Sequence, residues 1–327
     1  MPSIHTRPSW YLPDSAATPE GAYSSRRDFL KTVGVGGAML AGVACGGFAG
    51  AQEGSADPAI DAPLPDYTKN PNFADAGRPL TDIEHPTTFN NFYEFGLSKD
   101  EPVRYAKGFK LDPYLLKIDG LVDTPLELDL DQIEALGLEE RVYRFRCVEA
   151  WGMTVPWLGV PLSKILAKAG PKSDAKFISM QTFFDPELSP GQKQLRNYPW
   201  PYTEGLRMDE AMNELTLAVT GMYGRRLPPQ SGTPLRIITP WKYGFKGPKS
   251  VVKITLLDSQ PRTFWNTAQS AEYKFYSNVD PEVPHPRWSQ ASEWWLGDRT
   301  TRHPTLWYNG YEKQVGHMYE GIPRTLY

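Results

Sequence analysis

The sequence predicts an α+β fold built from mixed β-sheets, short helices and long loops. Short apolar runs suited to strands are interleaved with short capped helical segments along the middle of the chain. The 327 residues include 31 prolines and 28 glycines, which indicates long ordered connections and excludes a helical bundle. Hydrophobic residues make up 40% and charged residues 22%, so the chain can bury a core. A net charge of −3 offers no electrostatic footprint for nucleic acid.

The expected elements follow from local patterns, in chain order. Residues 114–120 end in a glycine after an apolar run, which predicts a strand running into a turn. The segments 131–137 and 161–170 also end in glycine, and their apolar spacing predicts two short helices. Residues 142–148 alternate, which predicts a strand with Cys147 at its end. Further strands are expected at 176–183, 216–220, 234–239 and 250–256.

The first fifty residues have the pattern of an export signal. Arg26 and Arg27 precede an uncharged, glycine-rich run at 32–50, and a small-residue site lies at 49–51. This pattern predicts a twin-arginine signal peptide at 1–51, and the many glycines disfavour the alternative, a membrane anchor. The protein is therefore expected to pass folded through the twin-arginine translocase and to work in the periplasm. That route suits an enzyme whose cofactor is inserted before export.

Three segments are expected after the signal peptide. Residues 52–110 begin with a stretch rich in proline, aspartate and alanine, and we expect them to form an extended N-terminal arm. Residues 111–257 contain the predicted strands and helices and are expected to form the core. Residues 258–327 are aromatic and proline-rich, which predicts few regular elements and a loop-rich C-terminal extension packed on the core.

Cys147 is the candidate for chemistry. The chain has two cysteines, and Cys45 leaves with the signal peptide, so one thiol remains in an oxidising compartment. That thiol is either buried and inert or held by a ligand. No histidine has a partner at zinc-ligand spacing and no Gly-x-Ser-x-Gly motif occurs, which disfavours zinc and serine hydrolases. A soft thiolate suits a transition metal, whereas a nucleophilic cysteine needs a histidine base that the sequence does not name.

Three further features accompany this cysteine. Arg144 and Arg146 precede Cys147 and would favour its thiolate, unless the alternation of the strand turns them away. The loop 241–249 combines glycines with lysines, which suits a phosphate-bearing ligand, although a solvated basic turn explains the same composition. The segment 90–96 is either an arm packed on the core or a cap over a ligand.

Four stretches occur in order behind the signal: NNFYEFG at 90–96, RVYRFRCVEAW at 141–151, PWKYGFKG at 240–247 and HPRWSQA at 285–291. With these stretches the chain resembles the catalytic subunits of periplasmic protein-methionine-sulfoxide reductases, in the sulfite-oxidase fold family. The resemblance covers essentially the whole chain after the signal peptide. It implies a sulfite-oxidase-like molybdopterin-binding fold and one molybdenum–molybdopterin cofactor per chain, with Cys147 as the thiolate ligand of the metal.

The resemblance also implies which residues form the site. Those expected to contact the cofactor are Asn90, Tyr93, Glu94, Thr182, Ser231, Arg236, Gly247, Pro248 and Lys249. Ser231 stands where the family often has asparagine, so a hydroxyl replaces an amide there. Pro248 has no N–H, so any backbone donation falls to its neighbours. Glu149, two residues beyond the ligand, is expected either to manage protons near the metal or to be a loop carboxylate without a role.

The implied reaction is oxygen-atom transfer from methionine sulfoxide in oxidised periplasmic proteins, which consumes two electrons and two protons and releases water. The chain has no haem-attachment or iron–sulfur cysteine motif, so a separate donor is needed, and in the family this is a haem-bearing membrane subunit. The nearest alternative is an exported sulfite oxidase or dehydrogenase, whose sites place arginines after the ligand cysteine, where this chain has Val148 and Glu149. A non-enzymatic alternative is a carbohydrate- or peptide-binding module, suggested by 10 tryptophans and 17 tyrosines.

Overall fold

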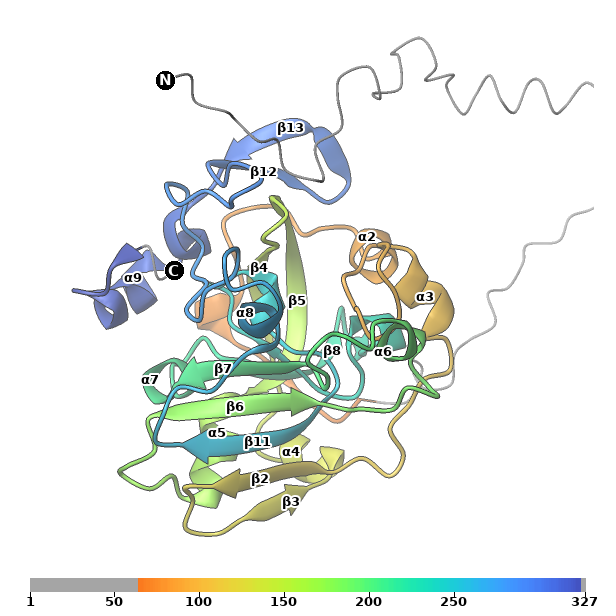
Figure 1. Ribbon diagram of the computed structural model, residues 1–327, viewed down its shortest axis with the longest axis vertical. Coiled ribbons are helices and arrows are strands. Elements are labelled where there is room, and N and C mark those ends of the chain that lie inside the picture. The colour runs from red at the N-terminus through yellow and green to blue at the C-terminus, as the bar shows by residue number, and fades with distance from the viewer. Residues whose placement is uncertain (1–63, 325–327) are drawn as a thin grey trace, which may run out of the picture. The chain divides into compact units, whose positions relative to one another are not determined.

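Two β-sheets with short helices around them make up the part of the chain that the computed structural model describes, residues 64–324 (Figure 1). These residues belong to one unit that spans 55–327. The expected signal peptide at 1–51 lies outside the described residues. Within 64–324, no helix is long and apolar enough to cross a membrane.

The larger sheet has the order β1-β4-β5-β12-β13, with β8 also paired to β5, and with β9 and β10 paired to β8. Its strands are β1 (Thr68–Lys69), β4 (Glu139–Arg146), β5 (Trp151–Pro161), β8 (Leu217–Met222), β9 (Arg225–Arg226), β10 (Arg236–Ile238), β12 (Ser292–Trp295) and β13 (Asp298–Pro304). The smaller sheet has the order β3-β2-β11-β6-β7. Its strands are β2 (Leu116–Gly120), β3 (Leu126–Leu128), β6 (Phe177–Thr182), β7 (Thr203–Arg207) and β11 (Val251–Leu257). Since β11 runs parallel to β2 and antiparallel to β6, the smaller sheet is mixed, as predicted.

The helices are short and begin and end at recognisable signals. The α-helices are α2 (Glu84–Thr88), α3 (Glu101–Tyr105), α4 (Leu130–Glu134), α5 (Leu162–Ala169), α6 (Pro190–Gln194), α7 (Met208–Ala211), α8 (Phe264–Ala268) and α9 (Glu312–Val315). The 3₁₀ helices are η3 (Pro71–Phe73), η4 (Pro229–Ser231), η5 (Gly244–Lys246), η6 (Trp307–Gly310) and η7 (Gly316–Tyr319). Helix α5 ends at Gly170 with φ +65°, as its glycine predicts. Helix α4 starts earlier than expected, because Asp129 is its N-cap and accepts from the backbone of Gln132.

Strand β5 is the main element that the sequence did not predict. All eleven of its residues are buried, between β4 on one side and β8 on the other. Its register with β4 pairs Pro156 with Val142. Gly159 allows β8 to approach closely, because a Cβ there would lie 2.5 Å from the carbonyl oxygen of Ala218.

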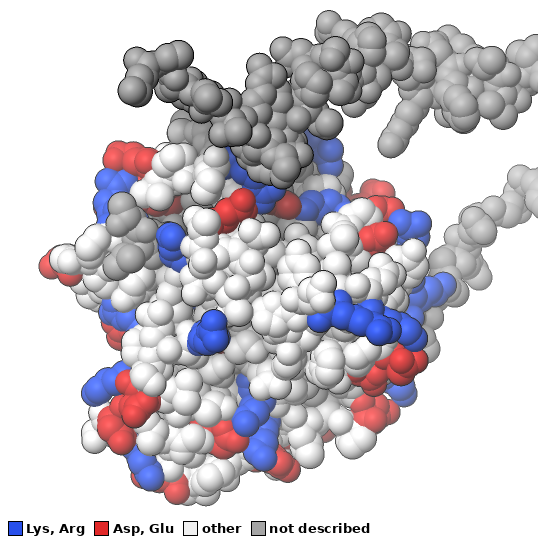
Figure 2. All heavy atoms as spheres, viewed as in Figure 1, with Lys and Arg blue, Asp and Glu red and all other residues white. Residues whose placement is uncertain are grey.

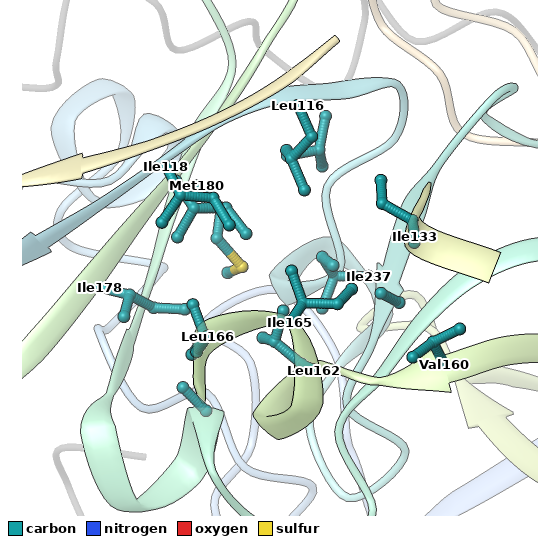
Figure 3. Close-up of a cluster of buried hydrophobic side chains, with 14 of the residues drawn as sticks. Leu116, Ile118, Ile133, Val160, Leu162, Ile165, Leu166, Ile178, Met180 and Ile237 are labelled. Carbon is teal, nitrogen blue, oxygen red and sulfur yellow. The ribbon is translucent and has the colours of Figure 1, made fainter. Parts of the chain in front are cut away.

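The main hydrophobic cluster joins the two sheets. Ile118 of β2 and Met180 of β6 come from the smaller sheet, Val160 and Ile237 come from β5 and β10 of the larger one, and Ile165 comes from α5. All five side chains are fully buried. Figure 3 shows them gathered with the other apolar side chains around α5. This core fixes the two sheets against each other and so fixes the loops that leave them.

The C-terminal segment has more regular structure than expected. Strand β12 pairs in parallel with β5, and Trp294 lies opposite Trp151 in that register. Tyr308, Tyr311 and Tyr319 are buried in a second cluster together with residues of β4, β5 and β8. The segment thus extends the larger sheet and completes a core. The predicted division at residues 110 and 257 remains a prediction.

Candidate active site

Cys147 lies in a tight turn between β4 and β5. Its N–H donates to the carbonyl of Trp151 at 2.9 Å, and the N–H of Ala150 donates to the carbonyl of Cys147 at 3.1 Å. Ala150 closes the turn with φ +62°, a conformation that is uncommon for a residue with a side chain. Because both flanking strands lie inside a sheet, the sulfur is held in one position. The side chain is 5% exposed, and the N–H of Glu149 points to Sγ at 3.4 Å.

A pocket opens over this sulfur. Segment 89–94, the turn around Cys147 and the loop 244–249 form most of its wall. Of the residues predicted for the site, those that line it are Asn90, Tyr93, Glu94, Cys147, Glu149, Arg236, Gly247, Pro248 and Lys249. The segment 90–96 therefore covers a cavity, as one of its two interpretations proposed.

The two remaining predicted residues lie behind the wall. Thr182 is fully buried, and its hydroxyl donates to Oε1 of Glu94 at 3.2 Å. Ser231 is buried, and its carbonyl accepts from Arg236 at 3.0 Å. The structure thus brings all eleven residues into one region, nine on the wall and two behind it. Their individual roles stay predictions.

A polar network surrounds the sulfur, and the sequence predicted only part of it. The side-chain amide of Asn91 lies 3.5 Å from Sγ of Cys147 and donates to Oε2 of Glu149 at 3.1 Å. Lys99 pairs with the same carboxylate oxygen at 2.5 Å, and the indole N–H of Trp151 donates to it at 3.2 Å. Burial alone would raise the pKa of Glu149, but Lys99 and these hydrogen bonds outweigh burial and hold the pKa below its usual range. Asn91 adjoins a predicted residue, whereas no local pattern singles out Lys99.

Of the two alternatives for Arg144 and Arg146, the structure supports the second, because the guanidinium groups of both arginines are directed at other partners, and the charge of Arg146 lowers the pKa of the thiol less than burial raises it. Arg146 is fully buried on the other side of the strand, where it pairs with Glu293 at 2.7 Å, and Arg144 donates to the carbonyl of Ala76. Burial and the charge of Glu149 raise the pKa of the Cys147 thiol to about 12. The protein alone therefore holds a thiol, and a metal that binds there would displace its proton.

Arg236 and Lys249 line the pocket, and neither has a carboxylate partner within residues 64–324. Arg236 is 2% exposed and donates to the carbonyl of Ser231, and burial lowers its pKa to about 9. The ammonium of Lys249 contacts neutral oxygens, at 2.9 Å from the carbonyl of Asn91 and 3.1 Å from that of Gln230. Burial, with the charge of Arg236 next, lowers the pKa of Lys249 well below its usual range.

Polar atoms beside these cations also lack partners. Among the described residues, neither Nε of Arg236 nor the buried hydroxyl of Ser231 has a hydrogen-bond acceptor or donor. Buried cations and orphaned donors cost free energy unless an anion meets them. This set of donors, Arg236, Lys249 and Ser231, which we call the cradle, therefore fits a phosphate-bearing group such as molybdopterin, and Cys147 in the same pocket is a soft ligand for its metal.

The three lysines of the loop 241–249 lie in different environments. Lys242 and Lys246 are fully buried and pair with Glu210 and Glu204, each at 2.6 Å, so they neither face solvent nor meet the pocket. Both sequence interpretations of the loop fail for these two lysines, and only Lys249 fits the phosphate-binding one. Gly247 permits a close approach, because a Cβ there would lie 2.3 Å from the carbonyl oxygen of Ile237. Its own N–H donates to the carbonyl of Gly244, which leaves the backbone N–H of Lys249 as the donor beside Pro248.

A second cavity, of about 510 Å³, adjoins the first and shares four wall residues with it. The shared residues are Tyr93, Glu149, Trp265 and Tyr273. Tyr198 and Trp288 add to this wall, and Arg287 at its rim pairs with Glu272 at 2.8 Å. We call this cavity the aromatic vestibule. Its wall combines these rings with charged and amide side chains, and the shared residues connect it to the pocket over the sulfur.

The fold and this site define a molybdopterin-binding oxidoreductase. Residues 103–265 match the family model of the oxidoreductase molybdopterin-binding domain, and this range includes Cys147 and both cradle cations. Residues 103–265 thus form an oxidoreductase molybdopterin-binding domain, and its cofactor is molybdopterin with molybdenum. The predicted fold class and cofactor are confirmed. Among solved structures, the chain is similar to the sulfane dehydrogenase SoxCD from Paracoccus pantotrophus, with 17% identity and a TM-score of 0.40 over 63% of this chain and 60% of that chain.

Glu94, in the wall of the pocket, is expected to make the stability of the cofactor-free protein depend on pH. Burial raises the pKa of Glu94 to about 7, so the unfolded chain releases this proton at a lower pH than the folded chain does. The cofactor-free protein is therefore expected to lose roughly 3 kcal/mol of unfolding free energy as the pH rises from about 4.5 to about 7. Urea titrations at pH 5 and pH 8 measure this difference. Glu94→Gln should remove most of it, whereas the exposed control Glu187→Gln should not; equal losses in both variants would contradict the assignment.

Proposed function

We propose that the protein reduces methionine sulfoxide residues in oxidised periplasmic proteins. In this proposal it is the molybdenum-dependent catalytic subunit of a reductase and receives electrons from a haem-bearing membrane partner. Its N-terminal sequence supports export of the loaded, folded protein through the twin-arginine translocase. The observation that carries the choice of substrate is the charge of the groups beside Cys147.

The group next to the sulfur is a carboxylate rather than an arginine. Glu149 lies 3.7 Å from Sγ of Cys147, and the nearby cation Lys99 is already paired with that carboxylate. Sulfite carries one or two negative charges near neutral pH, and two unit charges 4 Å apart repel by about 4 kcal/mol at an effective dielectric constant of about 20. A sulfoxide carries no net charge and meets no such repulsion. The site therefore favours a neutral oxygen donor.

The aromatic vestibule supports a substrate that is carried on a polypeptide. An entry of about 510 Å³ whose wall includes tyrosine and tryptophan rings is larger than a small inorganic anion requires. Such rings bury apolar side chains well while their polar atoms keep contact with water. A methionine sulfoxide side chain, together with the segment that bears it, suits this approach. The visible face of the molecule has basic and acidic side chains interspersed, without a patch of one sign that would select highly charged proteins (Figure 2).

The residues of the chain have distinct tasks in this proposal. Cys147 would hold the metal, and Arg236 and Lys249 would hold the phosphate-bearing part of the cofactor. The bound cofactor supplies the oxygen-atom transfer, in which sulfoxide, two electrons and two protons give thioether and water. Glu149 and Asn91 lie where they could hold a water molecule or a proton beside the reacting atoms.

Two alternatives remain distinct from this proposal. A sulfite oxidase or dehydrogenase would use the same domain and the same metal, so the domain match supports both enzymes equally. A carbohydrate- or peptide-binding module would need no molybdenum, and the molybdopterin-binding domain opposes it.

The test combines metal analysis with a comparison of substrates. The exported protein, purified with its cofactor, should contain about one molybdenum per chain. The sulfoxide assay uses an artificial electron donor, and the sulfite assay uses an artificial electron acceptor. The kcat/KM for a methionine-sulfoxide peptide should exceed that for sulfite by about 100-fold or more, because the carboxylate beside Cys147 repels the anion. Preferential oxidation of sulfite would overturn the proposed substrate and keep the enzyme class, and a metal-free, well-folded sample would overturn both.

A further inference from the structure

Lys99 takes part in the polar network around Cys147, although neither the sequence motifs nor the domain match assigns it a role. It lies before residue 103, where the match begins. Its ammonium pairs with Oε2 of Glu149 at 2.5 Å and also donates to the side-chain carbonyl of Asn91. Both partners approach the sulfur, with Nδ2 of Asn91 at 3.5 Å and Oε2 of Glu149 at 3.7 Å from Sγ. Lys99 thus contacts two residues, Asn91 and Glu149, each of which approaches the candidate metal ligand.

The chemistry of the ammonium fixes the orientation of the Asn91 amide. A lysine ammonium has three donors and no acceptor, so only the carbonyl oxygen of Asn91 can face it. The NH₂ group of Asn91 must then point the other way, toward Cys147 and Glu149. Without Lys99 the amide could turn over, and an oxygen would face the sulfur in place of a donor.

Lys99 is itself held in place. Its backbone carbonyl accepts from the N–H of Asn90 at 2.9 Å, and its ammonium lies 6.0 Å from the centre of the Phe89 ring. Its side chain is 26% exposed and that of Glu149 is 32% exposed. Partly exposed ion pairs of this kind contribute little to folding. A change that removes Lys99 is therefore expected to leave stability nearly unchanged and to act on the site.

We propose that Lys99 is a positioning residue, which keeps the amide of Asn91 and the carboxylate of Glu149 directed at the cysteine ligand of the metal. Groups that orient a metal ligand from outside tune the metal and typically alter affinity or activity by about 10- to 100-fold when removed. The inference rests on the molybdenum site at Cys147, which the proposed function shares. It does not depend on methionine sulfoxide as the substrate.

The test compares Lys99→Met with the holoenzyme and with two controls. Lys99→Arg keeps a cation that donates and cannot accept, and Lys110→Met removes an exposed lysine that pairs with Asp112 and does not line the pocket. The readouts are molybdenum content, melting temperature, the EPR spectrum of the partly reduced metal, and kcat and KM. Lys99→Met should keep its molybdenum and its melting temperature, shift the EPR spectrum and lower kcat by about 10- to 100-fold with KM changed less than about threefold. Lys99→Arg should recover part of kcat, and Lys110→Met should match the unaltered enzyme.

An unchanged EPR spectrum and kcat in Lys99→Met would overturn the proposal. If that variant loses its metal, the side-chain amide signal of Asn91 in ¹⁵N NMR spectra still decides. In the metal-free chain this signal should move in Lys99→Met and stay in place in Lys110→Met, and an unmoved signal would contradict the inference. The EPR and NMR readouts need no substrate. If the enzyme oxidised sulfite, the proposed function would be refuted, and these two readouts would still decide the role of Lys99.

Discussion

Replacing Cys147 by alanine is expected to abolish turnover and to leave a folded protein without its metal. The sulfur is the soft ligand that the pocket presents, and its position is set by a turn whose hydrogen bonds are made by the backbone. Activity should fall by more than about 100-fold, because even groups one step further from a metal typically matter by about 10- to 100-fold. The loss of one buried sulfur atom should cost only about 1 kcal/mol of unfolding free energy.

The measurement is molybdenum content together with turnover and the melting temperature of the purified variant. Cys147→Ser is the matched control, since it preserves size and the turn but presents a harder oxygen. It should retain more cofactor than alanine does and remain far below the unaltered enzyme in turnover. Full molybdenum content and full turnover in Cys147→Ala would show that the cysteine is a buried core residue and that the metal binds elsewhere.

The fold was predictable where local pattern and environment agree. Strand β6 alternates between half-buried and buried residues because one side of it packs on the core, and this alternation is visible in the sequence. Strand β5 is buried on both sides, so it has no alternation, and Pro156 and Gly159 count against a central strand. It forms because β4, β8 and β12 pair with it, and these pairings are not visible in the residues of β5 themselves.

The site was predictable where one residue carries the chemistry by itself. Cys147 could be singled out because removal of the predicted signal peptide would leave a single thiol, and a single thiol in the periplasm that the sequence predicts needs an explanation. Lys99 and Asn91 matter through the groups they meet across the fold, and polar loop residues have no periodic signature. Lys242 and Lys246 were misassigned for the same reason, since their carboxylate partners lie 32 and 42 residues earlier in the chain.

Replacing Arg236 by methionine is expected to act in opposite directions on the cofactor-free protein and on the holoenzyme. Burial without an anionic partner lowers the pKa of Arg236 to about 9, so the empty cradle holds this charge at a cost. Contacts with the rings of Trp157 and Phe145 offset part of that cost. The cofactor-free variant should gain roughly 1 to 3 kcal/mol of unfolding free energy, whereas its molybdenum content should fall by about tenfold or more. Lys249→Met should behave in the same way.

A second buried arginine provides the control. Arg141 is 4% exposed, pairs with Glu139 and donates to the hydroxyl of Tyr143 at 2.7 Å, so its charge is compensated within the chain. Arg141→Met should destabilise the protein by about 2 kcal/mol and leave the molybdenum content of the folded fraction unchanged. Urea titration and metal analysis of the two variants give four values, and the proposed cradle requires opposite signs of the stability change for Arg236 and Arg141. If both variants lost stability and both kept their metal, Arg236 would be an ordinary structural cation, and the phosphate-bearing group would have to bind elsewhere. A cofactor that neutralises buried charge stabilises the folded state by mass action. Arg236 and Lys249 would therefore make the loaded protein more stable than the empty one.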